Sequence, residues 1–165
     1  MRGRTYMEKV FNSYKEVIKR YDASEIKIST SVLDSFCHIK IKKLFVKDSF
    51  FVAFCNLPFS DAEVNQVVKC FEFYLNKENI DCKSLLCVFS ESANNAVGNY
   101  SYYFSAEKNS FVHPLVILEE NHQIYFDKDF DYYGGKAIKK FAEELIETVV
   151  RNFLYMKRLR FRYPC

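Results

Sequence analysis

Two short apolar runs on either side of a helical segment constrain the fold of this chain most strongly. Phe50–Cys55 and Ser84–Phe89 are almost wholly apolar, which is typical of strands buried on both faces. Between them, Ser60-Asp-Ala-Glu63 is a capping-box pattern, and apolar residues then recur at helical spacing, which predicts a helix over 61–77. A helix between two strands lets those strands lie parallel in one sheet.

The residues before this unit predict one helix and two further strands. Apolar residues between Met7 and Tyr21 fall on one helical stripe, which predicts a helix over about 6–21. Alternating apolar and polar residues then predict strands at Ile26–Ile28 and at Cys37–Ile41. The first half of the chain therefore has the predicted order helix, three strands, helix, strand.

The second half is predicted to add strands and a closing helix. Polar residues over 90–110 predict a long connection or a hairpin. Strands are expected at 100–105, 111–118 and 123–126, and a helix from about 136 to 156. Pro114, inside the second of these strands, favours a sheet edge or a bulge.

Length and composition agree with a single folded unit. The chain has 165 residues, of which 49% are hydrophobic, and this is enough for one packed core. We expect one α/β domain over residues 1–156, with a mixed sheet flanked by helices. Residues 157–165 are expected to form a basic, aromatic tail.

The cysteines and the hydropathy predict a cytoplasmic, soluble chain. Six cysteines stand mostly in apolar segments, no CxxC pair occurs, and no apolar run follows the first residues as in a signal peptide. Reduced core thiols are the simplest interpretation. Cys82 and Cys87 are expected on opposite faces of one strand, which disfavours a shared metal. No apolar stretch reaches the roughly 18–20 residues that cross a bilayer.

The basic charge of the chain is concentrated at its C-terminal end. The last fifteen residues contain no acid and five cations, namely Arg151, Lys157, Arg158, Arg160 and Arg162. Because the whole chain has a formal charge of +3, residues 1–150 together carry −2. A basic, aromatic segment on a mildly acidic body is typical of binding to an anionic membrane face, and nucleic acid is the less favoured partner.

A second basic cluster, formed by Lys40, Lys42 and Lys43, supports an alternative in which the chain binds nucleic acid. The order αβββαβ resembles the core of restriction-endonuclease-like folds, whose active members place an acid on the second strand and an acid-x-Lys pair on the third. The third strand here has neither, and Glu25-Ile-Lys27 has that local pattern only on the first strand. Asp34 and Lys40 would join it only in an unusual arrangement. A surface charge pattern is the simpler interpretation.

The remaining motifs predict no cofactor and no metal. His38, His113 and His122 each stand alone, and His113 before Pro114 is expected to be structural. Gly134-Gly-Lys136 lacks P-loop spacing and is expected to be a helix entry. The acids Asp127, Asp129 and Asp131 lack the glycine and the glutamate of a calcium loop.

Three segments resemble the N-terminal cytosolic domain that precedes the membrane core of some bacterial rhomboid intramembrane proteases. They are Leu115-Val-Ile-Leu-Glu-Glu-Asn-His122, Asp131-Tyr-Tyr-Gly134 and Lys157-Arg-Leu-Arg-Phe-Arg-Tyr-Pro164. The last segment is similar to the Arg/Phe/Pro lead-in of a first transmembrane helix.

The resemblance implies a non-catalytic domain. The rhomboid serine and histidine would lie beyond Cys165, and this domain would regulate the protease or present partners to it at the cytoplasmic face of the membrane. Positive charge flanking a span on that side is the expected sign. A small adaptor domain is a further alternative.

Overall fold

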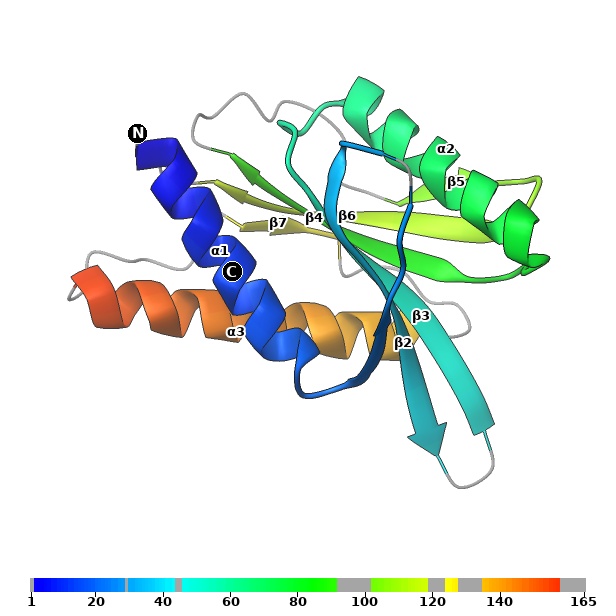
Figure 1. Ribbon diagram of the computed structural model, residues 1–165. Helices are drawn as coiled ribbons and strands as arrows, with labels where there is room; N and C mark the ends of the chain where they lie inside the picture. The colour runs from blue at the N-terminus through cyan, green and yellow to red at the C-terminus, as the bar shows by residue number, and fades with distance from the viewer. Residues whose placement is uncertain are drawn as a thin grey trace.

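The chain folds around one mixed β-sheet with helices on both faces (Figure 1). The computed structural model describes residues 2–28, 30–43, 46–91, 102–118, 124–127 and 135–157. Its helices are α1 (Arg2–Ile18), α2 (Asp61–Glu78) and α3 (Gly135–Lys157). Its strands are β1 (Asp22–Glu25), β2 (Leu33–Lys43), β3 (Val46–Cys55), β4 (Ser84–Glu91), β5 (Tyr103–Ser105), β6 (Ser110–Leu118) and β7 (Ile124–Phe126). The predicted α/β class, a mixed sheet flanked by helices, is confirmed.

The sheet joins an antiparallel part to a parallel part. Its strand order is β1-β2-β3-β4-β6-β5, and β7 also pairs with β6. The pairs β1–β2 and β2–β3 are antiparallel, whereas β3–β4 and β4–β6 are parallel. The parallel pairing of β3 and β4 across α2 is the arrangement that the sequence predicts.

The sequence accounts for α2 almost to the residue. Ser60 is the N-cap, and its side chain accepts a hydrogen bond of 3.4 Å from the backbone N–H of Glu63. At the other end Asn79 takes a left-handed conformation, with φ of 53°, and closes the helix. The buried side of the helix consists of Val64, Val67, Phe71 and Leu75. These are positions of the predicted apolar stripe.

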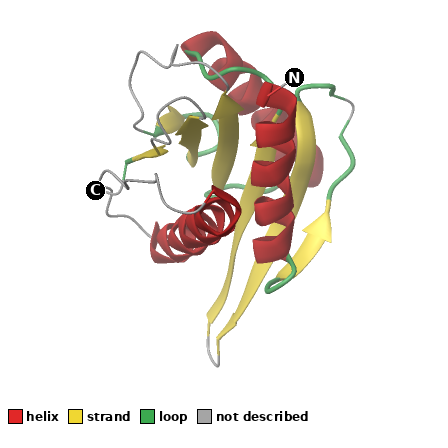
Figure 2. Ribbon diagram, turned by 90° about the vertical axis from the view of Figure 1, so that its left-hand side faces the viewer, coloured by secondary structure: helices red, strands yellow, loops and turns green. Residues whose placement is uncertain are grey.

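The two faces of the sheet are buried under different helices. One face packs against α2, and the other lies under α1 and α3 (Figure 2). Alternate residues of β4 supply the two cores: Leu85, Cys87 and Phe89 face α2, while Leu86 and Val88 face the α1 and α3 side. Burial on both faces explains why the runs that became β3 and β4 are apolar throughout.

Several element boundaries differ from the sequence prediction, most clearly those of the first strand and the first helix. The first strand forms at Asp22–Glu25 rather than at Ile26–Ile28, because these four residues are the ones that pair with Cys37–Lys40 of β2. The backbone N–H of Ile26 still donates to the carbonyl of Phe36 at 2.8 Å, so the extended chain continues one residue further. The first helix covers Arg2–Ile18 instead of 6–21, because its polar first turn carries no apolar stripe.

The expected edge position of Pro114 is wrong. Strand β6 lies inside the sheet, between β4 on one side and β5 and β7 on the other. In the described residues, β5 pairs as far as Val112 and β7 begins to pair at Leu115. Pro114 therefore stands where β6 changes antiparallel partners, and a missing N–H is tolerated there.

Candidate functional site

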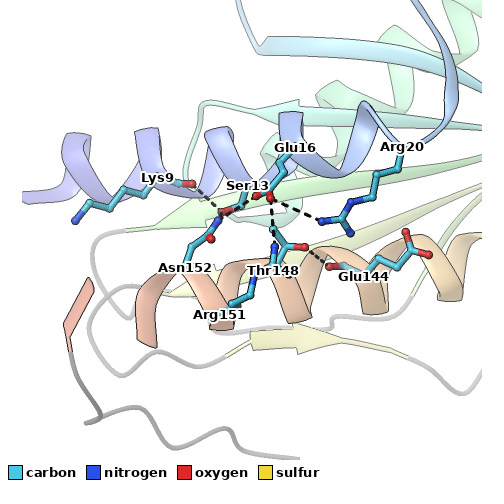
Figure 3. A network of polar contacts seen from close by, with 8 residues as sticks. All are labelled: Lys9, Ser13, Glu16, Arg20, Glu144, Thr148, Arg151 and Asn152. Carbon is cyan, nitrogen blue, oxygen red and sulfur yellow. Dashed lines mark hydrogen bonds and ion pairs between the residues drawn. The ribbon is translucent and has the colours of Figure 1, made fainter. Parts of the chain in front are cut away.

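Arg151, the first cation of the C-terminal fifteen residues, lies in a polar contact between α1 and α3. The guanidinium of Arg151 (Nη2) lies 3.2 Å from Oε1 of Glu16 (Figure 3). The amide of Asn152 donates to Oε2 of Glu16 at 3.3 Å and to the hydroxyl of Ser13 at 2.8 Å. Arg20 adds a longer ion pair of 3.8 Å to Glu16. We call this group of residues the α1–α3 seam; it consists of Lys9, Ser13, Glu16, Arg20, Glu144, Thr148, Arg151 and Asn152.

Small side chains let the two helices approach closely at the seam. Ser13 and Thr148 are both buried, and each hydroxyl donates to a carbonyl one turn back in its own helix, on Lys9 and Glu144 respectively. Their polar groups are therefore satisfied without a partner from outside the helix. Glu16 then provides a counter-charge for Arg151, so this arginine has a structural partner.

The rest of the predicted membrane-binding set is not described in side-chain detail. Lys157 ends α3, but only its backbone is described. Arg158, Arg160 and Arg162 lie outside the described residues. The structure shows what precedes the basic tail. Helix α3, which has 23 residues and packs against α1 and the sheet, leads directly into it.

The second basic cluster lies on a part of the sheet that is only two strands wide. Strand β1 pairs with β2 no further than Lys40, and β4 begins to pair with β3 at Phe51. Between these limits, residues 41–43 of β2 pair only with residues 46–48 of β3 within the described chain, and the pair Lys40–Ser49 forms the base of this segment. This two-stranded segment, called the ribbon below, projects away from the helices (Figures 1 and 2).

The lysines of the ribbon are exposed and weakly paired. Lys40 and Lys42 are both exposed, and the Lys42 ammonium lies 3.8 Å from Oδ2 of Asp22 with its side chain 87% exposed. An ion pair so exposed contributes about 0–1 kcal/mol. The side chain of Lys43 is outside the described residues.

Two further residues near this surface, His38 and Lys83, were not connected with it by the sequence reasoning. His38 is half-buried, and its ring stacks on that of Phe51 with centroids 4.5 Å apart. Burial lowers the pKa of His38, and the nearby charges of Lys40 and Lys83 lower it further. Lys83 precedes β4, and nothing in the sequence pattern connects it with β2.

The acidic residues of the nuclease hypothesis do not meet Lys40. Asp34 stands at the register irregularity at the start of β2, where its Oδ1 accepts a hydrogen bond of 2.8 Å from the Asn56 amide. At about 3.4 Å per residue, Lys40 lies roughly 20 Å further along the same strand. Glu25 faces Cys37 in the register. In the part of the chain that the structure describes, no three His, Cys, Asp or Glu residues are grouped as metal ligands.

The buried titratable groups are held in their neutral forms by the core. Burial, with a smaller effect from Lys139, lowers the pKa of His113 to about 3. Burial raises the pKa of Cys37 and Cys87, as expected of core thiols. Cys82 differs from its prediction: it is exposed, precedes β4 and has a φ of 57°, so it does not share a strand with Cys87.

Several predicted features lie where the structure gives little or no description. His122, Asp129, Asp131 and Gly134 are outside the described residues. The helix expected near Lys136 begins at Gly135. None of the described helices combines the length and apolar character that a bilayer span requires.

No protein-family model matches this chain, and no curated protein has a significantly similar sequence.

Proposed function

We propose that this chain is a non-catalytic interaction or regulatory domain that binds an anionic membrane face through the basic segment at the end of α3. The observation that carries the proposal is the distribution of charge. The last fifteen residues contribute five cations and no acid, whereas residues 1–150 together carry −2. Each Lys or Arg near an anionic leaflet contributes on the order of 1 kcal/mol of attraction.

The packing of α3 supports this arrangement. Phe153, near the end of the helix, is buried and packs its ring against Tyr6 of α1 with centroids 4.8 Å apart. Together with the Arg151–Glu16 ion pair, this contact fixes the end of α3 to the domain. The basic segment therefore starts from a fixed point, and a cationic segment anchored in this way would orient the domain on a membrane.

The chemistry of the polar groups in the body favours structural roles. The His113 ring is buried with a strongly lowered pKa, and Asp34 holds the Asn56 amide. These contacts support an interaction domain in preference to a hydrolase.

The resemblance to the cytosolic domain of rhomboid proteases makes the proposal more specific. In that case the domain would be attached to a membrane protein such as a rhomboid-type serine protease, at the cytoplasmic face, and the catalytic residues would lie outside this chain. The parent reading frame tests this attachment. Apolar spans after Cys165 that include a serine and a histidine are expected, and a stop codon at that point would contradict it.

Vesicle co-sedimentation tests the membrane proposal itself. The variant Lys157→Gln/Arg158→Gln/Arg160→Gln/Arg162→Gln should bind phosphatidylserine-containing vesicles roughly a thousandfold more weakly than the unaltered chain, if each charge contributes about 1 kcal/mol. Neither protein should bind purely zwitterionic vesicles.

A matched control separates the tail from total charge. Lys9→Gln/Lys19→Gln/Lys69→Gln/Lys77→Gln removes four cations from α1, the turn that follows it and α2, and none of them belongs to the tail. It should bind nearly as tightly as the unaltered chain. Equal losses in the two variants would contradict a role for the tail, provided that circular dichroism shows both to be folded.

A further inference from the structure

The ribbon presents a basic face that the membrane proposal does not use. Side chains alternate along β2, and Phe36 belongs to the core under α2, whereas Cys37 and Ile39 belong to the core under α1 and α3. Because the period is two, Lys40 and Lys42 face the α2 side together with Phe36. His38, stacked on Phe51 of the α2-side core, confirms this assignment.

This basic face and the end of α3 lie on opposite sides of the sheet. Helix α3 packs with α1 on one face, whereas strand alternation directs the ribbon lysines to the face that carries α2. The ribbon lysines therefore belong to a surface separate from the one under α3.

We infer that the α2-side face of the ribbon, with Lys40, Lys42 and Lys83, binds the sugar-phosphate backbone of double-stranded DNA. The shape of the ribbon favours this partner. Its two strands are about 4.8 Å apart, and the major groove of B-form DNA, about 12 Å wide, admits a two-stranded β-ribbon. Residues 41–43 extend beyond the last pair with β1 by about 10 Å, which is close to the groove depth of about 8.5 Å.

Charge at the ribbon also favours a polyanion. The Lys42–Asp22 contact is exposed and long, at 3.8 Å, so a phosphate oxygen would replace Asp22 at little cost. Lys83 stands two residues before Leu85 of the α2-side core, so strand alternation places it on this face as well.

Fluorescence anisotropy with a labelled 20-base-pair DNA duplex tests the inference. In about 50 mM salt the variant Lys40→Gln/Lys42→Gln should bind on the order of tenfold more weakly for each lysine removed, and its slope of log K against log salt should fall by about 2. Double-stranded RNA, whose major groove is too narrow to admit a ribbon, should bind the unaltered chain more weakly.

A control variant and a second ligand complete the test. Lys136→Gln/Lys140→Gln makes the same change of charge at exposed positions of α3, and it should leave DNA binding nearly unchanged. Equal losses in both variants, or no loss in either, would overturn the inference. If Lys40→Gln/Lys42→Gln instead reduced binding to phosphatidylserine vesicles and left DNA binding intact, the ribbon would be a membrane contact and the DNA site would be refuted.

Discussion

The α1–α3 seam and the ribbon both contain basic side chains, but these side chains are paired more closely in the seam than in the ribbon. In the seam, Arg151 lies 3.2 Å from Glu16, and the neighbouring hydroxyls are satisfied within their own helices. In the ribbon, the Lys42 ammonium lies 3.8 Å from the Asp22 carboxylate, and its side chain is 87% exposed. A closely paired basic residue contributes to packing, while a weakly paired one can exchange its partner for a ligand. The seam therefore contributes to packing, and the ribbon is the surface proposed for binding.

The largest loss of stability is expected for a substitution in the core beneath α3. Phe141 of α3 is fully buried, and its ring packs edge-on against Phe50 at 5.8 Å and against Tyr21 at 5.2 Å. Phe141→Ala should lower the free energy of unfolding by about 3–5 kcal/mol, measured by urea denaturation. Phe73 of α2 is 71% exposed, and Phe73→Ala should change stability by less than about 0.5 kcal/mol. Similar losses would mean that α3 is not packed as described.

A pH effect of intermediate size should come from His113. Its pKa is about 3 in the folded chain and about 6.5 when unfolded, so below pH 6.5 the unfolded chain takes up a proton that the folded chain does not. The free energy of unfolding should therefore fall by up to about 1.4 kcal/mol per pH unit as the pH drops from about 6 to 4.

The variant His113→Gln isolates this contribution. Its unfolding free energy should depend less steeply on pH over that interval, whatever its stability at pH 7. His38, which is only half-buried, provides the control, and His38→Gln should change the slope less. An unchanged slope in His113→Gln would show that the ring is not neutral in the folded core.

A smaller effect is expected from the polar contacts of the seam. Asn152→Ala removes the hydrogen bonds to Ser13 and Glu16 and should cost about 1 kcal/mol. Asn65→Ala, at an exposed position of α2, makes the same change of helix propensity without those contacts. The difference between the two variants in their loss of unfolding free energy, measured by urea denaturation, gives the contribution of the seam contacts. Equal losses would contradict a structural role for these contacts.

The smallest effect on stability is expected in the ribbon. Lys42→Gln removes only a weak, exposed ion pair with Asp22, so the free energy of unfolding should change by less than about 0.5 kcal/mol. A loss above 1 kcal/mol in thermal or urea unfolding would show that Lys42 is structural, and the contrast with the seam would fail.

Local patterns in the sequence predicted those parts of the fold that local interactions determine. The capping box at Ser60 and the apolar runs that became β3 and β4 depend on neighbouring residues, and they were predicted within the observed elements, although β3 begins at Val46 rather than at Phe50. The place of β1 and the interior position of Pro114 depend on register and strand order. Since these are set by pairing between distant segments, composition and periodicity could not supply them.

The same distinction holds for the candidate sites. The clustering of Lys40, Lys42 and Lys43 is visible because they are close in sequence. The addition of Lys83 to that surface, and the pairing of Arg151 with Glu16 across 135 residues, depend on the folded sheet and on helix packing. No spacing rule predicts which cation of a basic segment will acquire an acidic partner from another element.

The most direct test compares two single substitutions, Arg151→Gln and Arg160→Gln, each of which removes one cation from the C-terminal fifteen residues. Both variants are measured for binding to phosphatidylserine vesicles and for stability in urea. Arg160→Gln should weaken vesicle binding about fivefold with unchanged stability. Arg151→Gln should weaken binding less than about twofold and lower stability by about 0.2–1 kcal/mol, because its charge is already paired with Glu16. Equal effects of the two substitutions on vesicle binding would contradict the assignment of Arg151 to packing and of the following cations to the membrane.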